Sequence, residues 1–94
     1  MRIAFVEYKI IKEKRALYMD YLRRLKQSGD VEIYEGADQP GLFVEIWQIG
    51  EAKRGAWREI RQKLGDWNEL LGVVEGGEGK IHIWEFDRLE SFES

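Results

Sequence analysis

The alternation of hydrophobic and polar residues predicts four β-strands in this chain. Each predicted strand is rich in β-branched and aromatic residues and is bounded by a change of pattern or by turn residues. The four segments are residues 2–10, 31–35, 42–49 and 80–86. Residues 36–41, Gly-Ala-Asp-Gln-Pro-Gly, are typical of a chain reversal, so we expect the second and third strands to form a β-hairpin.

Two other segments carry hydrophobic residues at helical spacing. In residues 14–28 the apolar stripe consists of Leu17, Tyr18, Tyr21, Leu22 and Leu25. In residues 51–64 it consists of Ala52, Ala56, Trp57, Ile60 and Leu64. Gly65 is expected to end this second helix. Asp66 lies three residues before Glu69, a helix-start spacing that predicts a short further helix carrying Trp67, Leu70 and Leu71.

The order of elements is strand, helix, strand, strand, helix, strand. This is the ferredoxin-like β-α-β-β-α-β order of the α+β class, in which a four-stranded antiparallel sheet carries both helices on one face. With 94 residues, the chain is expected to form a single domain, ordered over about residues 2–87.

Strand alternation divides the sheet residues into two sets. The mostly aliphatic set contains Ala4, Val6, Val31, Ile33, Leu42, Val44, Ile46, Ile81 and Ile83. The aromatic and ionisable set contains Phe5, Glu7, Glu32, Tyr34, Phe43, Glu45, Trp47, His82, Trp84 and Phe86. We expect the aliphatic set to pack beneath the helices and the aromatic set to face outward; the alternative is the reverse assignment. An exposed apolar patch of this size is rare on soluble monomers, so a partner or ligand is expected to cover it.

Composition narrows the classes of function. Hydrophobic residues make up 44% and charged residues 35% of the chain, which is typical of a globular domain. The formal charge of −3 disfavours nucleic-acid binding through general electrostatics. Without cysteine, the chain has no disulfide, thiolate metal site or cysteine nucleophile. We find no signal peptide and no apolar run long enough for a membrane span, so a cytoplasmic location is expected.

The element order, the strand Phe43-Val44-Glu45-Ile46-Trp47 and the helical Ala56-Trp57 resemble the dimeric α/β-barrel superfamily. This superfamily includes the antibiotic-biosynthesis-monooxygenase-like and NIPSNAP-like proteins, and the resemblance covers about residues 2–87. It implies a homodimer in which two sheets meet face to face, with a pocket inside each subunit. Because the superfamily includes cofactor-free oxygenation, haem degradation and isomerisation, the fold alone does not choose an activity.

The haem-degrading branch of this superfamily uses an asparagine in the first strand and a histidine in a helix. This chain has Glu7 at the comparable place, and its single histidine, His82, is in the last predicted strand. Haem degradation of that type is therefore not expected, and no other cofactor is predicted. No ligand-spacing motif supports a metal site.

Three ionisable residues, Glu7, Glu45 and His82, are the candidates for catalysis. A carboxylate beside a histidine can act as a general base, with the histidine carrying the proton. The alternative is that the glutamates lie at the barrel rim in water or bind the partner subunit. The candidates for binding a small hydrophobic or aromatic ligand are Tyr34, Trp47, Trp84 and Phe86. These aromatic residues equally suit the core of a dimer.

Two polar segments have simpler interpretations. The basic stretch from Lys12 to Lys26 is interpreted as a solvated helix face, with an anionic partner as the alternative. Residues 76–79, Gly-Gly-Glu-Gly, lack the lysine and hydroxyl of a phosphate-binding loop, and are interpreted as a mobile connection that could gate the pocket.

Three functions remain open at this point. The first is a cofactor-free enzyme, monooxygenase-like or isomerase-like, that uses Glu7, Glu45 and His82. The second is a non-catalytic domain that binds a ligand in the same pocket. The third is a structural dimer whose barrel is filled by aromatic side chains.

Overall fold

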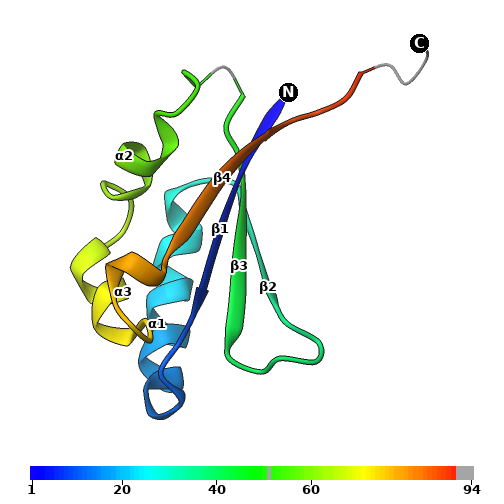
Figure 1. Ribbon diagram of the computed structural model, residues 1–94. Helices are drawn as coiled ribbons and strands as arrows, with labels where there is room; N and C mark the ends of the chain where they lie inside the picture. The colour runs from blue at the N-terminus through cyan, green and yellow to red at the C-terminus, as the bar shows by residue number, and fades with distance from the viewer. Residues whose placement is uncertain (51, 91–94) are drawn as a thin grey trace.

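The computed structural model describes residues 1–50 and 52–90, which form an α+β structure built on one antiparallel sheet. The strands are β1 (Arg2–Lys9), β2 (Val31–Glu35), β3 (Leu42–Gln48) and β4 (His82–Asp87), in the spatial order β2-β3-β1-β4. The α-helices are α1 (Arg15–Leu25), α2 (Trp57–Arg61) and α3 (Trp67–Val73), with short 3₁₀ turns at Lys12–Lys14, Lys26–Ser28 and Glu78–Lys80. The three α-helices lie together on one side of the sheet (Figure 1).

The four predicted strands and the hairpin are confirmed, with small shifts at the strand ends. The first strand ends at Lys9 because Ile10 leaves the ladder, forms a bridge with Val74 and donates its N–H to the carbonyl of Gly41. The last strand begins only at His82 because the residues before it form a 3₁₀ turn. None of the helices in the described ranges has the length and hydrophobicity needed to cross a bilayer.

Helix α1 buries the predicted stripe apart from one residue. Tyr18, Tyr21, Leu22 and Leu25 belong to the hydrophobic core, whereas Leu17 is 57% exposed, so the prediction for Leu17 is wrong. Successive helical residues are rotated by about 100°. With Tyr18 directed into the core, Leu17 therefore lies at the margin of the stripe and faces solvent.

The predicted helix over residues 51–64 is confirmed only for Trp57–Arg61, because residues 62–64 form a turn before Gly65 and the first half is not helical. Residues 52–56 contain no helix, and α2 begins only at Trp57. Gly55 has a φ of 82°, in the left-handed region, and the next residue donates its N–H to the carbonyl of Lys53 in a turn. A right-handed helix does not continue through a residue in that conformation. Residue 51 lies outside the described residues.

The inward face of α2 also differs from the prediction at one position. Trp57 is buried as expected, but Ile60 is 37% exposed and Arg61 is fully buried. Residues four apart share a helix face, so the face that buries Trp57 also buries Arg61. The short further helix is confirmed: the Asp66 side chain accepts the N–H of Glu69 at 3.1 Å and caps α3.

Strand β3 has the opposite orientation to the one predicted. Ala4 faces Trp47 and Val6 faces Glu45 across the β1–β3 ladder, and residues directly opposite each other share a face of the sheet. The buried side of β3 therefore consists of Phe43, Glu45 and Trp47, beneath the helices. For β1, β2 and β4 the aliphatic residues lie on the helix side, as predicted.

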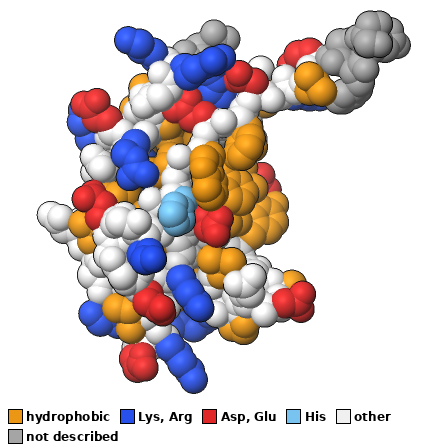
Figure 2. Space-filling model, viewed as in Figure 1, with side chains coloured by type: hydrophobic (Ala, Val, Ile, Leu, Met, Phe, Trp, Pro, Cys, Tyr) orange, Lys and Arg blue, Asp and Glu red, His pale blue; other side chains and the backbone are white. Residues whose placement is uncertain are grey.

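The side of the sheet without helices is called the open face. The ladder places on it Ile3, Phe5, Glu7, Glu32, Tyr34, Leu42, Val44, Ile46, His82, Trp84 and Phe86. Trp84 is 46% exposed and Phe86 is 51% exposed. Figure 2 shows hydrophobic side chains gathered beside the histidine on the visible surface. The open face is thus a mixed aliphatic and aromatic surface that also carries the ionisable side chains of Glu7, Glu32 and His82.

Candidate functional site

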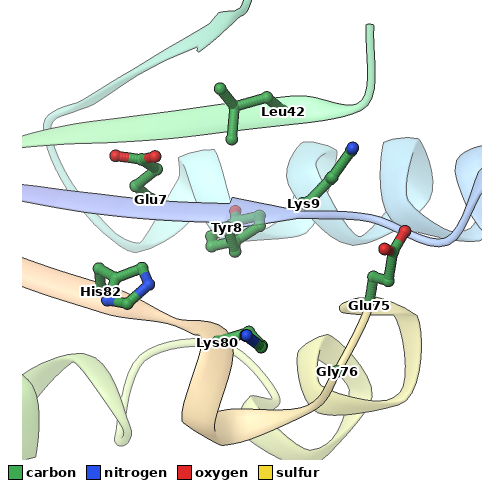
Figure 3. A pocket seen from close by; sticks show the side chains of 8 residues that line it. All are labelled: Glu7, Tyr8, Lys9, Leu42, Glu75, Gly76, Lys80 and His82. Atoms are coloured by element: carbon green, nitrogen blue, oxygen red, sulfur yellow. The ribbon is translucent and has the colours of Figure 1, made fainter. Parts of the chain in front are cut away.

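The candidate site lies at one end of the open face, where β1 and β4 approach the loop after α3. Glu7 and His82 are partners in the β1–β4 register. Beside them is a hollow of about 310 Å³, which we call the Glu7–His82 pocket (Figure 3). Its lining consists of Glu7, Tyr8, Lys9, Leu42, Glu75, Gly76, Lys80 and His82.

Strand alternation and ring stacking position the two central residues of this pocket. Val6 and Tyr8 are buried on the helix side, so Glu7 between them is directed to the open face. The His82 ring is stacked on Trp84, with ring centroids 5.6 Å apart and planes at 9°. Within residues 1–50 and 52–90, the side chains of Glu7 and His82 have no hydrogen bond or ion pair. A carboxylate and an imidazole placed in this way can accept a proton and pass it on.

Two of the predicted ligand-binding aromatic residues lie together beside this pair. Phe5 is 6.1 Å from Trp84 and 6.1 Å from Phe86, measured between ring centroids. Tyr34 is in β2, at the far edge of the sheet, and its hydroxyl donates to Glu32 at 3.0 Å. Three strand spacings separate β2 from β4, which is about 14 Å. The aromatic group near His82 therefore includes Phe5, which was not among the predicted ligand-binding residues, and does not include Tyr34.

Glu45 and Trp47 do not reach the Glu7–His82 pocket, so their expected place on the open face is wrong. Glu45 is fully buried on the helix side of the sheet. It accepts hydrogen bonds from the Tyr8 hydroxyl at 2.5 Å, from Trp47 Nε1 at 2.8 Å, and from Arg61 Nε and Nη2 at 2.7 and 2.8 Å. A carboxylate can be buried only when such partners replace water, and here the core supplies them.

Arg61 is the principal buried residue that the sequence patterns missed. Besides its pair with Glu45, it donates to the Tyr21 hydroxyl at 2.8 Å and to the Leu64 carbonyl at 3.0 Å. Burial alone would lower the pKa of the Arg61 guanidinium, but the hydrogen bonds and charge of Glu45 raise it above its ordinary value. The sequence did contain one signal for its burial: Arg61 lies four residues after Trp57, on the same face of the helix. The Glu45–Arg61 pair is part of the protein core and is out of reach of a ligand in solvent.

The tyrosines around this pair remain protonated at neutral pH. Burial is the main cause that raises the pKa of Tyr8, and the charge of Glu45 adds to it. Burial also raises the pKa of Tyr18 and Tyr21. The hydroxyls of Tyr8 and Tyr18 are hydrogen-bonded to each other at 2.8 Å. These residues therefore act as neutral hydrogen-bonding groups that fix Glu45 and Arg61 in place.

A second hollow of about 450 Å³ adjoins the Glu7–His82 pocket and shares Lys9 and Glu75 with it. Arg15 also lines this hollow, but its guanidinium is paired with Glu35 at 2.6 and 2.7 Å. The hydrogen bond from Arg15, with a further one from the Gly41 N–H, lowers the pKa of Glu35 to about 2. This ion pair is therefore formed throughout the neutral pH range.

No group of three or more histidine, aspartate or glutamate side chains among residues 1–50 and 52–90 is arranged to hold a metal ion. A scan against models of protein families found no match to this chain, and a search of curated proteins found no significantly similar sequence. The open face and the Glu7–His82 pocket are therefore the features from which a function can be inferred.

Proposed function

We propose that this protein is a homodimeric small-molecule-binding domain of the dimeric α/β-barrel type, in which Glu7 and His82 perform acid–base chemistry without a cofactor. The observation that carries this proposal is the composition of the open face. It combines exposed apolar side chains with a carboxylate and an imidazole that are partners across two neighbouring strands. An apolar surface suits a second subunit, and the ionisable pair suits a reaction at its edge.

The dimer is supported by the arrangement of layers. The strand order β2-β3-β1-β4, with all the helices on the face opposite the open face, agrees with a ferredoxin-like subunit. In such a subunit the open face can pack against the open face of a second copy. Sheets pack face to face through interdigitating side chains at about 10 Å. Homodimer interfaces are more apolar than ordinary surfaces. A second copy would shield Trp84 and Phe86 from water and would enclose the Glu7–His82 pocket.

Enclosure of the pocket by a second subunit would make Glu7 and His82 more effective as acid–base groups. When water is excluded, charges inside a site influence one another more strongly. Glu7 would remove a proton from a carbon of the ligand, and His82 would transfer protons at the same end of the pocket. An isomerase returns the proton to another atom of the ligand. In a cofactor-free monooxygenase O₂ reacts with the carbanion, one oxygen atom is retained in the product, and the other leaves as water with electrons and hydrogen atoms from the ligand itself.

A non-catalytic ligand-binding or structural dimer is the second candidate. The contacts of Phe5 with Trp84 and Phe86 favour it, because an aromatic group of this kind can serve as a dimer core without any reaction. In this case compounds would bind in the pocket, or the barrel would be filled, and no turnover would follow.

The proposed dimer can be tested through its molecular mass and through a variant that should be monomeric. Sedimentation equilibrium at micromolar concentration should give about twice the chain mass of 11.1 kDa. Trp84→Glu should give a folded monomer, because dimer formation would bury an unpaired charge at a cost of several kcal/mol. Leu17→Glu is the matched control, since Leu17 is an exposed apolar residue on α1, away from the open face. A monomeric parent protein, or a Trp84→Glu variant that still dimerises, would contradict the proposed interface.

The acid–base pair predicts a loss of turnover without a loss of binding. For a compound found to turn over in a screen, Glu7→Gln and His82→Ala should each slow the reaction by roughly 10²–10⁴-fold, the usual contribution of a general acid or base. Glu32→Gln removes another carboxylate of the open face, far from the pocket, and should leave the rate unchanged. Binding without turnover by the parent protein would instead favour the second candidate.

A further inference from the structure

We infer that the ligand of the Glu7–His82 pocket is a small, singly charged organic acid, whose carboxylate binds Lys9 and Lys80. This inference rests on the proposed function and names its substrate class. It starts from the two adjoining hollows, which meet at Lys9. Figure 3 shows Glu7 and His82 at one end of the pocket, Lys9 and Glu75 at the other, and Lys80 on the β4 side.

The lysines of this region are available for an anion. Among the described residues, Lys9, Lys12 and Lys80 have no hydrogen bond or ion pair through their side chains. Arg15 is already occupied by Glu35. These three ammonium groups gather around two joined hollows in a chain whose formal charge is −3. Two glutamates, Glu7 and Glu75, line the same hollows, so with Arg15 paired to Glu35 the net charge around them is +1, opposite in sign to that of the whole molecule.

Lys80 is held in place by the backbone of the loop before it. A Cβ atom added to Gly76 would lie 2.5 Å from Cγ of Lys80, so the lysine stem packs directly on this glycine. Gly76 also has a φ of 83°, a conformation that side-chain-bearing residues rarely adopt. The glycine-rich segment therefore supplies a wall of the pocket and orients one ammonium group along it.

The remaining charges limit the ligand to a single negative charge. Glu7 and Glu75 line the same pocket and would repel a multiply charged anion such as a phosphate ester. Leu42 lines the first hollow and Pro40 the second, so each offers apolar surface to the body of the ligand. A ligand carboxylate bound between Lys9 and Lys80 would leave the adjoining carbon atoms of the ligand directed toward Glu7, the proposed base.

The test compares two probes of the same shape that differ in charge. We expect 2-naphthoate to bind the parent protein about tenfold more tightly than neutral 2-naphthamide, since a hydrogen bond to a charged group is worth about that factor. Binding would be followed by amide chemical shifts of residues 7–9 and 76–82. Lys9→Met and Lys80→Met should each remove most of the preference for the acid and leave the binding of the amide unchanged. Lys26→Met, at the opposite end of α1, is the matched control and should change neither affinity.

Three results would overturn the assignment. The first is equal affinity of the parent protein for acid and amide. The second is an unchanged preference in both lysine variants, and the third is displacement of naphthoate by an equal concentration of inorganic phosphate. If the amide binds the dimer at the pocket and the acid has no advantage, the charge assignment fails while the proposed function stands. If the parent protein is a monomer and neither probe shifts these residues, both fail.

Discussion

Replacing Glu45 with alanine is expected to lower the free energy of unfolding by about 3–5 kcal/mol, a large part of the roughly 5–15 kcal/mol typical of a small domain. The change would leave the buried guanidinium of Arg61 without its carboxylate. It would also remove the acceptor for the Tyr8 hydroxyl and for Trp47 Nε1. Urea unfolding followed by far-UV circular dichroism would measure the loss.

Two controls separate the ion pair from a general effect of removing a glutamate. Glu13→Ala, in the exposed 3₁₀ turn before α1, should change stability by less than about 0.5 kcal/mol. The double variant Glu45→Met with Arg61→Leu should be more stable than either single variant, because it leaves no unpaired buried charge. If the losses of the two single variants simply add in the double variant, the pair is not the source of the effect.

Replacing Trp57 with alanine is expected to cost about 3–5 kcal/mol, because a large buried ring would be replaced by a cavity. Trp57 is buried and packs on the Trp47 ring, with centroids 5.4 Å apart. Together with Arg61, which lies over the same Trp47 ring, it connects the short helix α2 to the core aromatic residues. The free energy of unfolding would again be measured in urea, and a loss well under 1 kcal/mol would place Trp57 at the surface.

A phenylalanine at the same position provides the matched variant. Trp57 Nε1 is buried and has no hydrogen-bond partner within the described residues. Trp57→Phe removes this donor and keeps most of the ring, so its cost should stay below about 1.5 kcal/mol. A phenylalanine variant as unstable as the alanine variant would contradict this prediction and would show that the core here requires the full indole ring.

The sequence predicted the elements well because their signals are local. The strands, the 36–41 turn and the Asp66 cap each depend on residues close together in the chain. The first half of the second predicted helix failed because the positive φ of Gly55 outweighs the helical spacing of Ala52 and Ala56. Spacing alone does not report such a backbone conformation.

The candidate site was only partly predictable, because its members depend on the orientation of one strand. Glu7, His82, Trp84 and Phe86 share the open face, as expected from alternation in β1 and β4. In β3 both faces are hydrophobic, and Glu45 can be buried with Phe43 and Trp47 because a side chain 16 residues further along the chain, Arg61, pairs with it. Such a long-range partner cannot be read from the strand itself.

The two-sided character of β3 gives the Glu45–Arg61 pair a role in the uniqueness of the fold. A shift of the strand by one residue would exchange its faces and bury Leu42, Val44 and Ile46, which are hydrophobic enough to fill a core. The hydrophobic effect alone therefore discriminates weakly between the two alignments. In the shifted alignment Arg61 would face aliphatic side chains and lose its counter-charge. The buried pair thus favours the observed strand register, because the competing alignment would leave the guanidinium of Arg61 buried without a carboxylate.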